Sequence, residues 1–266
     1  MNDNKFNIAV LIDGDNAQAK LINEIIEEVS KYGKATIRRI YGDWTNSHMN
    51  SWKEALNKNS ISPIQKFSYT TGKNSTDSSL IIDAMDILHG HTVEGFCIVS
   101  SDSDYTGLAK RIREQGLFVM GIGKSTTPVA FVNSCEIFTF TENLLPEEEM
   151  ATTSIRIEKK KTVSKSKKQK EIPIVITNQL NTNNAPQNKK TKLNMSQLDK
   201  AFEISAGEDE EAYISTVGNA LRKIDPSFDP RTYGFKSLTQ LFQSIPKYQI
   251  VRNEMNGLSY PILKLR

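Results

Sequence analysis

The pattern of apolar segments constrains the fold of this chain more than any other feature of its sequence. Over about 140 residues, short apolar runs typical of strands alternate with segments whose apolar side chains recur at helical spacing. The first run, residues 6–12, is nearly continuous and ends at Asp13, as expected for a strand buried on both faces. Further strands are expected at 35–41, 61–67, 95–99, 117–122 and 137–140, and helices at 21–29, 44–56, 77–88 and 105–115. This alternation predicts an α/β fold with a mostly parallel sheet covered on both sides.

The pattern stops after Leu145 and returns at Leu193. Residues 146–192 are basic, Asn-rich and poor in apolar side chains apart from an island at 172–176, so a flexible linker is expected there. From residue 193, helical spacing is followed by two short strands that Asn256-Gly257 would join as a hairpin. The predicted domains are therefore an α/β domain (1–145), a linker (146–192) and a small winged-helix α+β domain (193–266).

Composition excludes several classes of protein. The two cysteines lie in apolar, strand-like contexts, which argues against a disulfide framework, and no Cys/His spacing of the zinc type occurs. No apolar run reaches the roughly 18 residues of a membrane span, so no membrane partner is expected. The N-terminus lacks the layout of a signal peptide, and the cytoplasm is the expected location. The oligomeric state, including a homodimer, stays open.

Positive charge is concentrated in the predicted linker. Residues 151–192 hold 11 Lys/Arg against 2 Asp/Glu, whereas residues 1–150 hold 14 against 20. A basic segment between neutral or acidic domains indicates a polyanionic partner, although many such segments only keep a protein soluble.

Five aspartates recur where the predicted sheet presents its strand ends. Asp13 and Asp15 follow the first strand, Asp77 begins a helix, and Asp102 and Asp104 follow the strand at 95–99. In open α/β sheets, ligands bind beyond the carboxyl ends of the strands. Carboxylates that repel one another at such a place are compensated by a hard divalent cation, and two such ions are common in phosphodiester cleavage. The alternative is that each aspartate only caps a helix or a turn.

Helical geometry separates the acidic residues of the segment 77–88. Asp77 shares a face with Ile81, Ala84 and Leu88, which places its carboxylate on the side of the sheet. Asp83 and Asp86 fall on the opposite, polar stripe, where a solvated face is expected. Asp15 and Asp104 are either second ligands or turn formers.

Other polar residues near these strand ends are secondary candidates. Asn16 is a candidate to hold a ligand carboxylate or a metal-bound water through its amide, and Ser101 either does likewise or caps the helix at Tyr105. The three histidines fit ordinary surface positions. Four basic residues are candidate phosphate contacts, with surface charge as the alternative: Arg38, Arg39, Lys73 and Lys124.

Three separated motifs resemble the NYN domain, the LabA-like branch of the PIN-like nuclease superfamily. They are Asp13-Gly-Asp-Asn16, Asn74-Ser-Thr-Asp77 and Ser100-Ser-Asp-Ser-Asp-Tyr105, and the segment 39–44 is similar as well. The resemblance covers about residues 5–145 and implies a PIN-like three-layer fold with Mg²⁺- or Mn²⁺-dependent RNA cleavage. The family's acidic metal site corresponds to Asp13, Asp77, Asp102 and Asp104 here, and Asn16 matches its asparagine after the first strand.

The C-terminal segment Phe228-Asp-Pro-Arg-Thr-Tyr-Gly-Phe235 resembles the OST-HTH, or LOTUS, domain. This resemblance implies a winged helix that binds RNA, either single-stranded or structured. Tyr233 and Lys236 are the candidate RNA contacts, with core packing as the alternative role for the tyrosine ring.

Three functions remain to be compared. The leading hypothesis is a metal-dependent RNA endonuclease whose C-terminal domain captures RNA. The rival is a non-catalytic RNA-binding adaptor with a vestigial acidic site. A third possibility is a phosphatase of the haloacid-dehalogenase type, because Asp13-Gly-Asp15 fits that nucleophile motif, although a well-placed partner lysine is lacking.

Overall fold

The computed structural model describes residues 6–67, 75–145, 193–207, 209–255 and 258–266. Two earlier predictions, the linker at 146–192 and the apolar island at 172–176, lie outside these residues. No helix within the described ranges is both long and apolar enough to cross a membrane.

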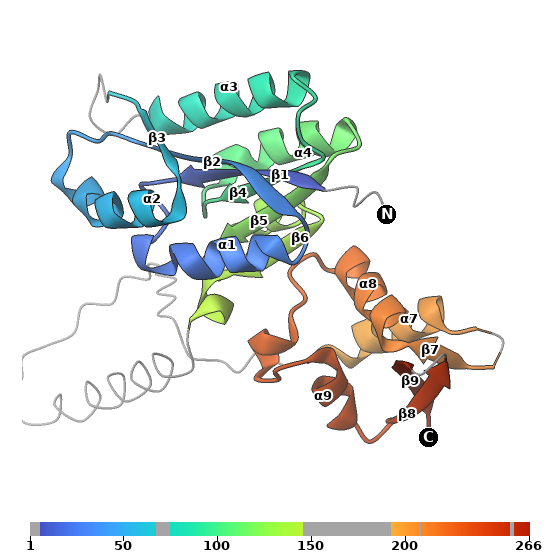
Figure 1. The fold of residues 1–266 in the computed structure, drawn as a ribbon. Helices are drawn as coiled ribbons and strands as arrows, with labels where there is room; N and C mark the ends of the chain where they lie inside the picture. The colour runs from blue at the N-terminus through green and yellow to red at the C-terminus, as the bar shows by residue number, and fades with distance from the viewer. Residues whose placement is uncertain (1–5, 68–74, 146–192, 208, 256–257) are drawn as a thin grey trace, which may run out of the picture. The chain divides into compact units, whose positions relative to one another are not determined.

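The N-terminal part contains one parallel sheet of six strands in the order β3-β2-β1-β4-β5-β6 (Figure 1). The predicted α/β fold with a parallel sheet is therefore confirmed. Strand order reverses on the two sides of β1, which places a topological switch point between β1 and β4. The strands are β1 Asn7–Asp13, β2 Lys34–Gly42, β3 Ser62–Gln65, β4 Gly95–Val99, β5 Phe118–Gly123 and β6 Ile137–Phe140.

Helices cover both faces of this sheet. Figure 1 shows α3 and α4 on one face and α1 on the other. The bounds are α1 Ile22–Ser30, α2 Lys53–Asn59, α3 Ser75–His89, α4 Thr106–Glu114 and α5 Val129–Val132, with 3₁₀ turns at η1 Ala19–Leu21, η2 Ser47–Trp52, η3 Ser103–Tyr105 and η4 Thr141–Leu144.

The predicted helix at 44–56 is wrong in its first part. Only η2 and α2 are helical in this region. The side chain of Asp43 accepts hydrogen bonds from the backbone N–H and the hydroxyl of Thr45 at 3.1 and 2.6 Å. Such local side-chain bonds favour a turn over a helix, and they hold the chain in a turn after β2.

Strand β1 lies at the centre of the core because both of its faces are covered. Residues Ile8 to Ile12 are fully buried, and Ala9 and Leu11 pack in the cluster that includes Leu80 and Ala84 of α3. Gly14 follows the strand at a close approach, where an added Cβ would lie 2.7 Å from the carbonyl oxygen of Tyr41. This tight passage fixes the direction in which the chain leaves β1.

The C-terminal part contains helices and a three-stranded antiparallel sheet in the order β7-β9-β8. The predicted terminal hairpin is confirmed, with strands longer than expected, although its joining residues 256–257 lie outside the description. The bounds are α7 Met195–Ser205, β7 Glu211–Tyr213, α8 Ile214–Ile224, η5 Pro230–Tyr233, α9 Leu238–Gln243, β8 Tyr248–Met255 and β9 Leu258–Leu265.

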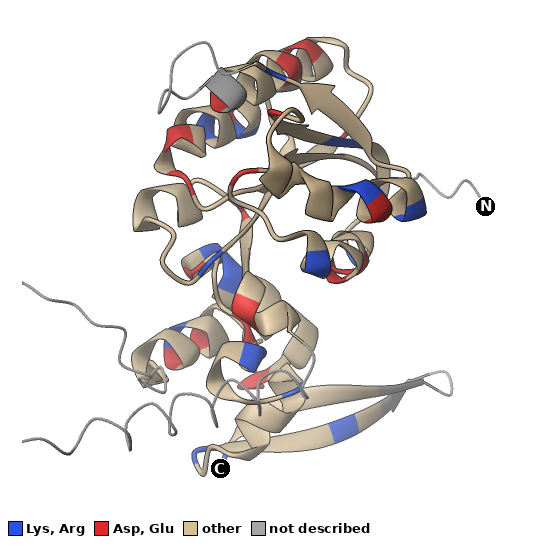
Figure 2. Cartoon of the chain, turned by 90° about the vertical axis from the view of Figure 1, so that its left-hand side faces the viewer, with Lys and Arg blue, Asp and Glu red and all other residues tan. Residues whose placement is uncertain are grey.

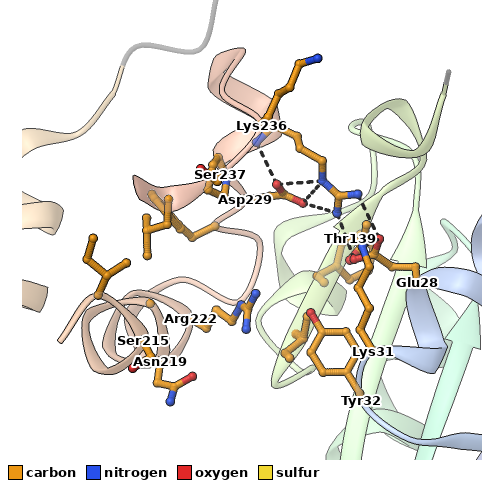
Figure 3. A pocket seen from close by; sticks show the side chains of 18 residues that line it. Glu28, Lys31, Tyr32, Thr139, Ser215, Asn219, Arg222, Asp229, Lys236 and Ser237 are labelled. Atoms are coloured by element: carbon orange, nitrogen blue, oxygen red, sulfur yellow. Dashed lines mark hydrogen bonds and ion pairs between the residues drawn. The ribbon is translucent and has the colours of Figure 1, made fainter. Parts of the chain in front are cut away.

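One buried acid is neutralised by a residue far away in the sequence. Glu28 of α1 is 3% exposed, and both of its carboxylate oxygens accept hydrogen bonds from Arg231 at 3.0 Å (Figure 3). Arg231 also donates to Asp229, and Lys31 donates to Glu28 at 2.7 Å. This pairing supplies the compensation that a buried carboxylate requires.

Candidate functional site

The carboxyl ends of β1 and β4 bring together residues that are far apart in the sequence. The two strands are parallel neighbours, with Ile12 opposite Val99. Asp13 is the last residue of β1, and Ser100 directly follows β4. Ligands of open α/β sheets bind at this kind of switch point. The strand order therefore places the first and third acidic motifs at one edge of the sheet.

Asp13 is a buried carboxylate held by three hydrogen bonds. Its Oδ2 accepts from the amide of Asn16 at 2.7 Å and from the hydroxyl of Ser100 at 2.8 Å, and its Oδ1 accepts from the backbone N–H of Asp15 at 3.2 Å. Its side chain is fully buried. Burial raises the pKa of Asp13, and the bonds from Asn16 and Ser100 oppose that rise. Asp13 thus orders the loop that follows β1.

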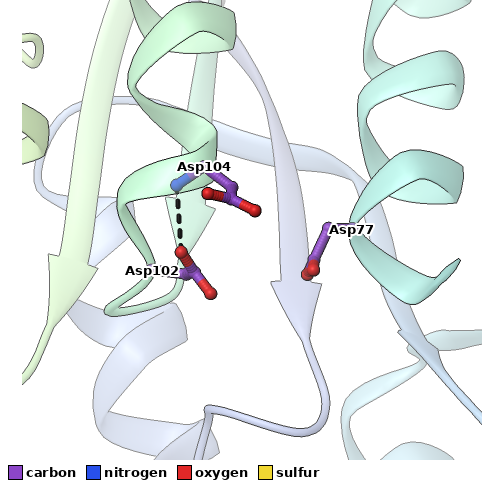
Figure 4. A group of neighbouring side chains, drawn as sticks. All are labelled: Asp77, Asp102 and Asp104. Atoms are coloured by element: carbon purple, nitrogen blue, oxygen red, sulfur yellow. Dashed lines mark hydrogen bonds between the residues drawn. The ribbon is translucent and has the colours of Figure 1, made fainter. Parts of the chain in front are cut away.

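Three further carboxylates converge beside this position. Asp77, Asp102 and Asp104 each offer an oxygen that lies within 4.8 Å of the other two (Figure 4). Asp77 projects from the first turn of α3, while Asp102 caps η3 by accepting the backbone N–H of Asp104 at 3.0 Å. Asp77 and Asp102 are half-buried, and Asp104 is exposed. We call these three residues the aspartate triad.

The electrostatics of the aspartate triad favour a bound cation. The pKa of Asp77 is raised, first by burial and then by repulsion from Asp13, Asp102 and Asp104, while a hydrogen bond from Tyr105 opposes the rise. In the described ranges, no lysine or arginine forms an ion pair with Asp13, Asp77 or Asp102. Asp13, Asp77 and Asp102 therefore concentrate negative charge that no described lysine or arginine pairs with.

Two residues of the third motif received no role in the sequence analysis. Tyr105, which is fully buried, donates its hydroxyl to Asp77 Oδ1 at 2.6 Å. Ser100, which is 2% exposed, donates to Asp13 and accepts the backbone N–H of Asp102 at 3.1 Å. Ser100 thereby links the first acidic motif to the third. Its position directly after β4, level with the end of β1, is the sequence signal that would have favoured it over Ser101.

The remaining acidic candidate, Asp15, points to a different partner. Its carboxylate lies 2.9 Å from Nε2 of His48, and its backbone N–H closes the turn onto Asp13. Asp15 therefore fits the role of turn former better than that of a second ligand. His48, expected to be an ordinary surface histidine, is paired with this carboxylate.

The comparisons with known proteins identify the family of the N-terminal part. The family model for the NYN domain matches residues 7–145, which is more than half of the chain. The chain belongs to the NYN domain family. A second model, the OST-HTH/LOTUS domain, matches residues 167–260. The NYN domain is a PIN-like nuclease family, and OST-HTH domains bind RNA.

Solved structures provide weaker likenesses. The structure of a protein of unknown function from Vibrio parahaemolyticus aligns with this chain at a TM-score of 0.45 and 18% sequence identity. The alignment covers 52% of this chain and 94% of that chain. An uncharacterized protein from Nitrosomonas europaea is 22% identical with a TM-score of 0.27, over 36% of this chain and 92% of that chain. None of the curated proteins compared matches the chain.

The donor set of the NYN domain fits a hard divalent cation. Three carboxylates within reach of one another are the oxygen ligands that Mg²⁺ and Mn²⁺ prefer. Asp13 stands outside this group and carries two side-chain donors on one of its oxygens. A fully buried, hydrogen-bonded Asp13 is also a poor nucleophile, which argues against the phosphatase alternative.

Asp83 and Asp86 were both predicted to lie on a solvated face of α3. This prediction agrees with the position of Asp86 and is wrong for Asp83. Asp86 is exposed, whereas Asp83 accepts hydrogen bonds from Arg39 and from the hydroxyl of the buried Tyr41. The physical reason is that α3 packs across β2, so that side chains of this strand reach the stripe. Arg39 is therefore engaged within the NYN domain, and this pairing explains its place better than a phosphate contact does.

The other predicted phosphate contacts fall into different settings. Lys124 is exposed after β5, and its backbone N–H donates to Ser101 Oγ at 2.8 Å, at the edge of the sheet that carries Ser100. Arg38 instead donates to the backbone carbonyls of Ala35 and Asn59. Lys73 lies outside the described residues. Of the described candidates, Lys124 is the one that lies at the edge of the sheet carrying the candidate site.

The two predicted RNA contacts of the OST-HTH domain differ in exposure. The ring of Tyr233 packs on Phe228 with centroids 5.7 Å apart and borders the domain core, in agreement with the packing alternative. Lys236 is exposed just before α9, where its backbone N–H donates to Gln240.

Proposed function

We propose that this chain is a Mg²⁺- or Mn²⁺-dependent endoribonuclease with its active site at the aspartate triad. The observation that carries the proposal is the convergence of Asp77, Asp102 and Asp104 at the switch point of the NYN sheet. Membership of the NYN family supports a nuclease, and the OST-HTH match supports RNA as the partner. A cation held there would supply Lewis-acid stabilisation of charge on the phosphate and a lowered pKa of bound water.

The residues of the site would have different roles in cation binding, positioning and phosphate contact. Asp77, Asp102 and Asp104 would hold the cation, and Tyr105 keeps Asp77 in place by occupying one of its two oxygens. Asn16 and Ser100 fix Asp13, whose negative charge lies beside Asp77 and adds to the local field. Lys124, which is exposed at the edge of the sheet, would contact a phosphate of the RNA backbone. In this assignment Asp13 and Asn16 are positioning residues of the catalytic set.

RNA would be captured by the OST-HTH domain together with the basic residues 151–192. Eleven Lys/Arg in that segment would provide phosphate contacts whose affinity falls steeply with salt. Single-stranded or structured RNA is the substrate class that we expect. The cytoplasmic location and the domain limits 1–145, 146–192 and 193–266 stay predictions.

The direct test is a cleavage panel with end-labelled oligonucleotides. Single-stranded RNA, duplex RNA and DNA of the same sequence are each incubated with the full chain in Mn²⁺, in Mg²⁺ and in chelator. We expect cleavage within the RNA only when a divalent metal is present, with DNA left intact. A chain that binds RNA and cleaves nothing under any metal would be the adaptor instead.

A further inference from the structure

The OST-HTH domain contacts the free edge of the NYN sheet. β6 is the last strand of that sheet and pairs with β5 on one side only. The backbone N–H of Phe138 in β6 donates to the carbonyl oxygen of Pro226, between α8 and η5, at 2.8 Å. Just beyond β6, the side-chain amide of Asn143 donates to the hydroxyl of Thr232 at 2.9 Å. Proteins commonly cover an edge strand, because its unpaired N–H groups would otherwise pair with another chain.

A buried ion pair joins the same two domains. Glu28 is 3% exposed and is buried on α1 together with Ile25 and Val29. Both of its carboxylate oxygens accept hydrogen bonds from Arg231 at 3.0 Å. Lys31 also bonds to Glu28, but it belongs to the segment directly after α1, and its side chain is 51% exposed. Arg231 is therefore the cation that compensates this buried carboxylate from outside the NYN domain.

The reach of Arg231 differs from the local pairing of other charges in the OST-HTH domain. Lys247 forms an ion pair with Asp199 of the same domain, and Figure 2 shows basic and acidic positions intermixed there. Arg231 donates to Asp229, two residues away, and also to Glu28, 203 positions earlier in the chain. A guanidinium held by two carboxylates in this way has a defined orientation, which favours one geometry of the contact.

We propose that the segment 226–232 is a docking surface whose partner is the NYN domain of the same chain, with Arg231 as its central residue. The proposal requires neither the metal site nor RNA. Arg231 belongs to the segment 228–235 that carries the resemblance to OST-HTH domains, and in this chain it binds a carboxylate of the NYN domain. RNA phosphates would then be contacted by other parts of the OST-HTH domain and by the basic residues 151–192. Docking would also limit where captured RNA can reach on the NYN domain.

Hydrogen exchange at the amide of Phe138 tests the docking in the full chain, in chelator and without RNA. In the parent chain this amide should be protected, because Pro226 accepts its N–H. Arg231→Gln leaves Glu28 without the cation of the OST-HTH domain, so we expect exchange at Phe138 to be about 100-fold faster. Glu28→Gln keeps an oxygen that can accept from Arg231, and it should speed this exchange about tenfold.

Two controls make the result specific. Lys247→Gln removes an ion pair within the OST-HTH domain and should leave exchange at Phe138 within about twofold of that in the parent chain. The amide of Val10, in the buried strand β1, reports on opening of the NYN domain itself and should stay equally protected in every variant. Parental protection of Phe138 in the Arg231→Gln chain would overturn the proposal, as would an unprotected Phe138 amide in the parent chain.

A distance measurement covers the case in which a variant also opens the NYN domain. Fluorophores attached at Lys58→Cys and Lys200→Cys, exposed positions on α2 and α7, report on the distance between the two domains, since both native cysteines are buried. We expect one narrow distribution of transfer efficiency in the parent chain and a broader one after Arg231→Gln. Equally narrow distributions in both chains would contradict the proposal.

Discussion

Replacing Asp77 with asparagine is expected to slow Mn²⁺-dependent cleavage of single-stranded RNA by at least about 1,000-fold. The amide carries no charge, so it removes one of the three carboxylates that converge in the aspartate triad. Its oxygen can still accept the hydroxyl of Tyr105, which leaves the surrounding contacts in place. The measurement is a single-turnover cleavage rate with enzyme in excess, so that weakened binding does not enter the result.

Two measurements make this outcome specific. RNA affinity in chelator should stay within about twofold of that of the parent chain, because phosphate and base contacts lie elsewhere. Asp86→Asn, an exposed carboxylate removed from the same helix, should cleave at the parental rate. Full activity in the Asp77→Asn chain would refute the catalytic assignment.

Metal is expected to stabilise the parent chain strongly and the Asp77→Asn chain much less. A cation present at about 100 times its Kd contributes about 2.7 kcal/mol, which corresponds to a rise in Tm of about 5–10 °C for a protein of this size. In chelator, without the cation, we expect the Tm of the Asp77→Asn chain to exceed that of the parent chain. Because burial and neighbouring carboxylates raise the pKa of Asp77, its ionised form destabilises the folded state relative to the unfolded one. The neutral amide removes that cost, so Asp77→Asn should then melt higher than the parent chain.

The measurement is the Tm of each chain in chelator, in Mg²⁺ and in Mn²⁺. Asp86→Asn should respond to metal as the parent chain does, since its carboxylate is exposed and outside the triad. An equal metal-dependent rise in the parent and Asp77→Asn chains would show that the cation binds elsewhere.

The strand ends were predictable because apolar runs are strong local signals. The run at 6–12 ends at Asp13, and the run at 95–99 ends just before Ser100 and Asp102. Once both runs are assigned to one parallel sheet, the acidic motifs lie along its carboxyl edge, and the observed neighbouring of β1 and β4 brings them together. The sequence did not reveal which carboxylates converge. Asp13 is held by hydrogen bonds from Asn16 and Ser100, whereas Asp104 completes the aspartate triad.

Other features depended on contacts between distant segments. The helical spacing of 77–88 correctly put Asp77 and Ala84 on one side, but it carried no information that Arg39 and Tyr41 of β2 would reach Asp83. The turn at Thr45 depends on where the Asp43 carboxylate points, which propensity does not reveal.

The proposed function requires a divalent cation held by Asp77, Asp102 and Asp104. The test is the affinity of the RNA-free chain for Mn²⁺. Binding is measured through the loss of the free-ion signal in electron paramagnetic resonance, so no assumption about the substrate is needed. We expect the double variant Asp77→Asn and Asp102→Asn to bind Mn²⁺ about 100-fold more weakly than the parent chain, and Asp86→Asn to bind it equally well. Parental Mn²⁺ affinity in the double variant would contradict the account.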